Sequence, residues 1–134
     1  MAKGAFVNLT KNTSRPTNGK DQVVWKNKLG YIDGGRSLDV TAVTEDAIYA
    51  GHIVVMDKTT EVYRPLEVTD TAFSDIKAND EIVGLTVSSI RKDIAFASMV
   101  TIGIVDEGAL PYTISAALKT KVQAALPGLQ FHKY

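Results

Sequence analysis

Cysteine is absent from this chain of 134 residues. Without cysteine there is no disulfide bond, no thiolate metal site and no cysteine nucleophile. Long apolar runs are also lacking, and none approaches the roughly 20 residues that a membrane-spanning helix needs. The first residues carry no apolar stretch of the kind found in secretory signal peptides. We therefore expect a protein that is made in the cytoplasm and has no membrane partner.

Groups that could perform catalysis are scarce as well. There are two histidines, His52 and His132, and a zinc site needs more ligands at suitable spacing. Three acidic pairs are expected in solvated turns, and neighbouring residues on an extended backbone point to opposite sides, so no carboxylate dyad is indicated. The glycines at 30–35 lack the strand and helix of a dinucleotide motif. The sequence thus predicts no metal, no cofactor and no enzymatic activity.

The composition is that of a globular domain. Apolar residues make up 45% of the chain and charged residues 22%, which is ordinary for a folded protein. A length of 134 residues is enough for one domain with a sizeable core.

Charge is unevenly distributed although the net charge is zero. The chain up to Arg36 holds seven basic and two acidic residues, a net charge of +5, and the remainder carries −5. A basic segment on an acidic body suggests a negatively charged partner, although solubility and chance explain the pattern equally well. The basic residues stand singly, so an acidic protein surface is at least as good a partner as nucleic acid.

Residues 1–36 differ from the rest in composition. Asn, Thr, Lys, Gly and Ser dominate, and few apolar side chains are available to offset the entropy of ordering such a segment. The turn signal Asp33–Gly35 marks its end. We therefore expect an extended basic N-terminal arm at 1–36 and a compact β-rich domain at 37–134.

The arm contains the residues expected to contact a partner. Apolar side chains near its start form a candidate tip, and Trp25 is a candidate second anchor because a Trp among polar residues is a common interface hot spot. The alternative is that Trp25 folds back onto its own core. The full set of candidate binding residues is Phe6, Val7, Leu9, Lys11, Arg15, Trp25, Lys26 and Lys28.

Short β-type runs alternate with turns after the arm. Strands are expected within residues 38–43, 52–56, 61–64, 66–68, 81–87 and 96–105. Gly84 and Gly103 lie inside two of these runs, which indicates a bulge, a bend or a close backbone approach.

One helix is expected, over residues 114–126, where apolar side chains recur every three or four positions. Thr113 or Ser115 can cap its start, and Pro127–Gly128 ends it. A last short strand follows at 129–131. The predicted fold is mainly β, a small β-barrel or β-sandwich with one C-terminal helix and an extended N-terminal arm.

Short motifs follow one another in a set order along residues 38–131. They are IYAGHIVV at 48–55, Pro-Leu at 65–66, IVGLTV at 82–87, a strand ending in Gly-Ile-Val at 103–105, and LPGL at 126–129. In this order they resemble the head decoration and capsid auxiliary proteins of tailed phages.

This resemblance implies a non-enzymatic structural virion protein, made in the host cytoplasm and located on the outer capsid surface. It would bind the major capsid protein, often as a homo-trimer, and stabilise the shell, with the N-terminal arm contacting the capsid protein or a neighbouring subunit. Two alternatives are kept: the base of a head fibre, and a generic β-barrel binding module. The second could bind nucleic acid through the basic arm, although nucleic acid is the less favoured partner.

Overall fold

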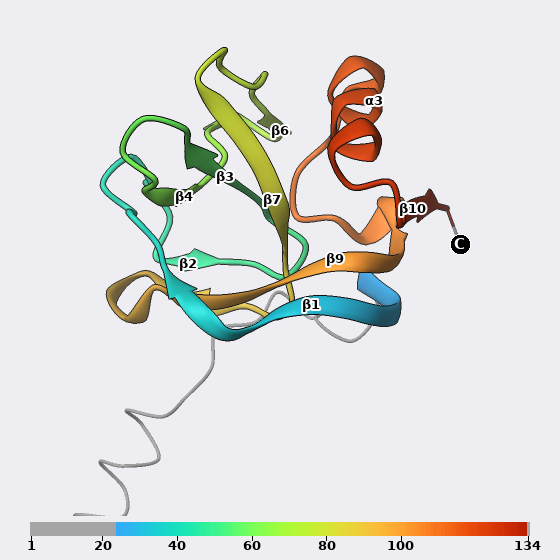
Figure 1. Cartoon of the computed structure of the whole chain (residues 1–134), viewed down its shortest axis with the longest axis horizontal. Coiled ribbons are helices and arrows are strands. Elements are labelled where there is room, and N and C mark those ends of the chain that lie inside the picture. The colour runs from blue at the N-terminus through green and yellow to red at the C-terminus, as the bar shows by residue number, and fades with distance from the viewer. Residues whose placement is uncertain (1–23, 134) are drawn as a thin grey trace, which may run out of the picture.

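The computed structural model describes residues 24–133 and is mainly β (Figure 1). The strands are β1 (Trp25–Ser37), β2 (Ala47–Ile48), β3 (Ile53–Asp57), β4 (Tyr63–Pro65), β5 (Val68–Thr69), β6 (Ala72–Phe73), β7 (Asp80–Thr86), β8 (Ile90–Arg91), β9 (Phe96–Asp106) and β10 (Leu129–His132). The helix α3 spans Ala116–Ala125, and 3-10 turns occupy Lys92–Ile94 and Glu107–Ala109.

One large sheet organises these elements. Its strand order is β1-β9-β7-β3-β4, and β10 also pairs with β9. All pairs are antiparallel except β10 with β9, which is parallel. The long strand β9 makes this branching possible, because β7 pairs with its residues 99–100 and β10 with residues 103–106. Two short ladders, β2 with β8 and β5 with β6, lie outside the main sheet.

Both faces of the sheet are buried at β3. Along β3, Ile53 and Val55 belong to one apolar cluster while Val54 belongs to another, as expected when successive side chains point to opposite faces. The first cluster contains the buried side chains of α3, and the second is built around Ile48 and Met99. Burial on both faces explains why β3 is an uninterrupted apolar run in the sequence.

The predicted fold class is confirmed at the level of a mainly β protein with a C-terminal helix. The arrangement is sandwich-like, and the sheets do not close into a barrel. β1 and β4 stand at the two ends of the main strand order, so the main sheet is open.

The predicted domain boundary at residue 36 is wrong for residues 25–36. These residues form β1, which runs alongside β9 from the pair Trp25–Val105 to the pair Ser37–Phe96 (Figure 1). Several register shifts interrupt this ladder, and each shift breaks the alternation of side chains that identifies a strand in sequence. The polar composition that suggested an arm is that of an edge strand with mostly exposed side chains.

The helix is slightly shorter than expected. It is capped by Ser115, whose side-chain oxygen accepts a hydrogen bond from the Leu118 amide at 3.1 Å. Its buried side chains are Leu118 and Val122, and Leu126 follows as the C-cap residue. Within residues 24–133 no helix is both long and apolar enough to cross a membrane.

Candidate functional site

Five of the eight predicted partner-binding residues lie outside the described residues. They are Phe6, Val7, Leu9, Lys11 and Arg15. The other three, Trp25, Lys26 and Lys28, lie on β1.

Trp25 is a core residue and not an exposed anchor. Its exposed fraction is 7%, and its indole Nε1 donates a hydrogen bond to the Thr86 carbonyl at 3.0 Å. The prediction that Trp25 anchors a partner is therefore wrong for the folded chain, and the alternative, that it packs onto its own core, holds. Its polar sequence neighbours gave a misleading signal because they lie on an edge strand, where polar side chains face solvent.

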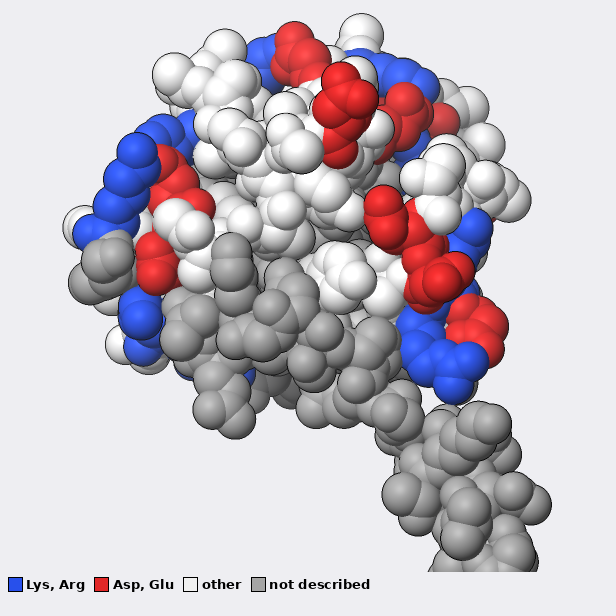
Figure 2. Space-filling model, turned by 180° about the vertical axis from the view of Figure 1, so that it is seen from behind, with Lys and Arg blue, Asp and Glu red and all other residues white. Residues whose placement is uncertain are grey.

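The paired strands β1 and β9 carry an exposed surface, which we call the ribbon surface: Lys26, Lys28, Leu29, Phe96 and Ile102. Both lysines are exposed. Three apolar side chains are also exposed, Leu29 to 71%, Phe96 to 58% and Ile102 to 46%. Leu29 and Ile102 lie near one end of the paired strands and Phe96 lies at the other, and exposed apolar side chains of this kind are available to a protein partner. Figure 2 shows another face on which charged side chains lie at the margins of a largely uncharged centre.

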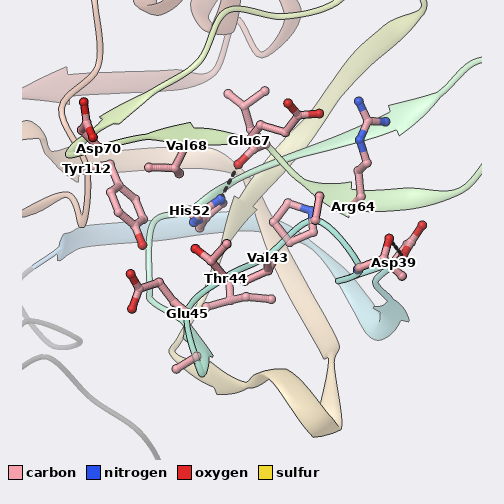
Figure 3. A pocket seen from close by; sticks show the side chains of 16 residues that line it. Asp39, Val43, Thr44, Glu45, His52, Arg64, Glu67, Val68, Asp70 and Tyr112 are labelled. Carbon is pink, nitrogen blue, oxygen red and sulfur yellow. Dashed lines mark hydrogen bonds between the residues drawn. The ribbon is translucent and has the colours of Figure 1, made fainter.

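A pocket of about 250 Å³ lies between the loop at 39–48 and the segment at 64–70 (Figure 3). We call it the acidic pocket. Its apolar lining is Ala42, Val43, Ala47, Ile48, Pro65, Leu66 and Val68. Four carboxylates also line it, those of Asp39, Glu45, Glu67 and Asp70, together with Arg64, His52 and Tyr112.

Two of the four carboxylates have no hydrogen bond or ion pair within residues 24–133. Glu67 forms an ion pair with Lys77, and Asp39 accepts hydrogen bonds from the Thr41 amide and hydroxyl, which lower the pKa of Asp39. The remaining two are Glu45 and Asp70. Arg64 does not neutralise them, because its guanidinium is paired with the buried carboxylate of Asp80.

His52 is a buried, neutral member of the pocket lining. It is 5% exposed, and burial lowers its pKa to about 4, against a weaker opposing effect of the Leu66 carbonyl. Its Nε2 lies 2.9 Å from that carbonyl. A carbonyl only accepts, so Nε2 carries the proton and Nδ1 is an acceptor. Within the described chain, Nδ1 is the one buried side-chain nitrogen or oxygen that has no hydrogen-bond partner.

Aromatic rings surround the imidazole. The rings of Phe73 and Tyr112 meet it edge-on, with centroids 5.0 Å and 5.6 Å away. Burial raises the pKa of the Tyr112 hydroxyl, and the negative charge of Glu45 raises it further. Glu45 thus lies close enough to Tyr112 for their charges to interact at the mouth of the pocket (Figure 3).

Sequence patterns did not identify this pocket. Its lining comes from parts of the chain that are separated in sequence, the ranges 39–48 and 64–70 together with His52 and Tyr112. The expectation that the acidic pairs are solvated is wrong for Asp80 and Asp106, which are buried. Among residues 24–133 no group of three or more His, Asp or Glu side chains is arranged to hold a metal ion.

Comparisons with known proteins returned no match to a family model, to a curated protein or to a solved structure.

Proposed function

We propose that this chain is a non-enzymatic structural virion protein that binds the outer surface of a phage capsid and stabilises the shell. Its partners are the major capsid protein and other copies of itself in a trimer. The proposal is supported by the order of motifs along residues 38–131, which resembles that of head decoration proteins. Residues 48–55, 82–87 and 103–105 of that series lie in or next to strands of the main sheet.

The ribbon surface is the structural observation that carries the proposal. It combines exposed apolar side chains, Leu29 and Phe96 among them, with the backbone edge of β1. Burial of such side chains drives protein association. An open strand edge adds main-chain hydrogen bonds to a partner strand. A structural protein that works by adhesion needs a surface of this kind, and residues 1–23 join the body at the start of β1.

Many copies on a lattice make strong single contacts unnecessary. When several subunits bind together, each additional contact forms at a high effective concentration. A trimer also presents three equivalent surfaces, and symmetric assembly buries the same patch on each subunit. A ribbon surface of modest size is therefore sufficient for stable attachment.

The test uses shells assembled from the major capsid protein encoded in the same genome. Purified protein is mixed with these shells, and bound copies are counted after sedimentation. We expect Leu29→Glu to weaken binding by about tenfold or more, because a carboxylate would be buried against an apolar contact. Val62→Glu is the matched control, since Val62 is 41% exposed but lies outside the ribbon surface. Equal occupancy by both variants would reject the ribbon surface as the contact.

A test of the role of residues 1–23 requires a shorter deletion than the predicted boundary at residue 36 suggests. Removing residues up to 36 would delete β1, whereas removing residues 2–21 leaves the buried Val24 and Trp25 in place. We expect the shorter deletion to keep the fold and reduce attachment.

The alternative function has a different outcome. Wild-type protein that does not bind shells but binds nucleic acid in a salt-dependent manner would instead support the generic binding module. Light scattering behind a sizing column tests the trimer.

A further inference from the structure

We propose that the acidic pocket holds a lysine or arginine side chain from residues 1–23 of the same chain. This inference concerns the free protein and does not depend on capsid binding. Its basis is the chemistry of the pocket, the unpartnered nitrogen of His52 and the place where residues 1–23 join the body.

The pocket suits a long cationic side chain. Lysine and arginine have an apolar stem and a charged head, and they bury the stem while the head remains near water or a counter-ion. The lining offers both environments, with aliphatic side chains such as Ile48 and Leu66 beside carboxylates. Glu45 and Asp70 are free to accept the head, since neither is engaged by another described residue. A volume of about 250 Å³ admits one such side chain.

His52 provides an independent indication of a ligand. Its Nδ1 is a buried acceptor without a partner among the described residues, and leaving a buried acceptor unsatisfied is unfavourable. The proton on Nε2 is held by the Leu66 carbonyl, so Nδ1 can be satisfied only by a donor. Ammonium and guanidinium groups carry donors and no acceptor, so a cationic head has the chemistry that an acceptor nitrogen or a carboxylate requires. Figure 3 shows His52 among the side chains of Thr44, Glu45 and Tyr112.

Residues 1–23 have the complementary charge. They hold four basic residues, Lys3, Lys11, Arg15 and Lys20, and one acidic residue, Asp21, a net charge of +3. Residues 24–133 hold 11 basic and 14 acidic residues, a net charge of −3. The attraction between the two parts is therefore favourable at neutral pH.

The first described residue after this segment, Val24, contacts a sequence neighbour of the pocket lining. Val24 lies against Gly51, the residue before His52, because a Cβ added to Gly51 would be 2.8 Å from Val24 Cγ1. The next nearest atoms belong to Leu110 and Pro111, which precede Tyr112 of the pocket lining. A tethered ligand binds at a high effective concentration. One cationic side chain of this chain can thus occupy a site too weak to capture a free peptide.

Limited trypsin digestion of the full-length protein tests the proposal. Trypsin cleaves after lysine and arginine, and a side chain held in the pocket is protected. Arg15 precedes Pro16 and resists cleavage, but its docking would protect the nearby Lys11. We expect the double variant Glu45→Gln/Asp70→Asn to accelerate cleavage at one or more of Lys3, Lys11 and Lys20 by about fivefold, the effect of losing two exposed ion pairs.

The control is Glu61→Gln/Glu81→Gln, which removes the same charge from two exposed side chains outside the pocket. The control should digest at the wild-type rate, and melting temperatures confirm that all variants are folded. Equal rates in the pocket variant and the control would overturn the proposal. An NMR measurement of the His52 ring nitrogens adds a direct readout, because loss of a donor shifts the Nδ1 resonance and leaves Nε2 in place.

Varying the protein concentration distinguishes docking of the segment within its own chain from docking onto a second copy. Protection by the chain's own segment is unchanged over a roughly hundredfold range of concentration, because the ligand is tethered. Protection that increases with concentration would overturn docking within one chain and indicate exchange between copies. No shell is present in these experiments, so a result that rejects docking in the acidic pocket leaves the proposed capsid role intact. A result that rejects capsid binding likewise leaves the docking proposal intact.

Discussion

The indole of Trp25 and the carbonyl of Thr86 are joined by a hydrogen bond of 3.0 Å although 61 positions separate them in the sequence. The same carbonyl accepts a hydrogen bond from the Gly51 amide at 3.0 Å. The start of β1, the end of β7 and the turn before β3 are therefore fastened at one buried point. Trp25 is a structural residue of this junction, which yields the first prediction.

Replacing Trp25 by alanine should destabilise the fold by about 3–5 kcal/mol, the usual cost of removing a buried Trp side chain. Trp25→Phe keeps most of the apolar contact and loses one hydrogen bond, so it should cost about 1 kcal/mol beyond any repacking. The Thr86 carbonyl retains its bond from Gly51 in both variants. Urea unfolding measures the two values. A Trp25→Ala protein of wild-type stability that fails to bind shells would restore the anchor role.

The ion pair between Arg64 and Asp80 supports the second prediction. The Asp80 side chain is 3% exposed and the Arg64 side chain 19%, and the bond to Asp80 raises the pKa of the guanidinium. Arg64→Met leaves a buried carboxylate without its counter-ion and should cost about 3 kcal/mol. Arg64→Lys should fall between this variant and wild type, because an ammonium cannot reproduce the two-point contact.

A double-mutant cycle isolates this pair. Adding Asp80→Asn to Arg64→Met should recover part of the lost stability, since the unpaired charge disappears. The exposed pair of Lys77 and Glu67 is the control, and Lys77→Met should change the free energy of unfolding only slightly. Strict additivity at Arg64 and Asp80 would show that the two side chains do not depend on each other.

Stability should decrease in mild acid because of His52. Its pKa is about 4 in the folded chain and 6.5 in the unfolded chain, so the unfolded state binds the proton more readily. The contribution of His52 is complete above pH 6.5 and is lost as the pH falls towards 4. Between pH 7 and pH 5 the free energy of unfolding should drop by about 2 kcal/mol from this group.

His52→Gln should remove this dependence, although the variant will be less stable at neutral pH. Urea unfolding at pH 7, 6 and 5 gives the slope for each protein. His132→Gln is the control, since His132 is exposed, and its slope should match the wild type. If His52→Gln and wild type lose stability in parallel between pH 7 and pH 5, burial does not lower the pKa of His52 as described.

Local patterns were sufficient for part of this structure. The helix end before Pro127, the apolar run of β3 and the cap at Ser115 depend on neighbours in sequence, and they were anticipated, the cap as one of two candidates with Thr113. β1 was missed because its stability comes from pairing with β9, about 70 residues away, and register shifts hide its alternation. The acidic pocket was missed for a similar reason, since His52 and Tyr112 meet only after folding.

The glycine inside β9 gives the last prediction, and it tests the packing of β1 on β9 directly. A Cβ added to Gly103 would collide with the backbone carbonyl oxygen of Asn27 on β1, so the close approach expected from the sequence is present. Neither backbone can move without breaking the ladder, and Gly103→Ala should therefore cost at least about 2 kcal/mol. Gly108→Ala is the control, because its added Cβ would meet only the Asp106 carboxylate, at 3.4 Å. Thermal unfolding of the two variants compares them, and equal melting temperatures would mean that β1 does not pack on β9 this closely in solution.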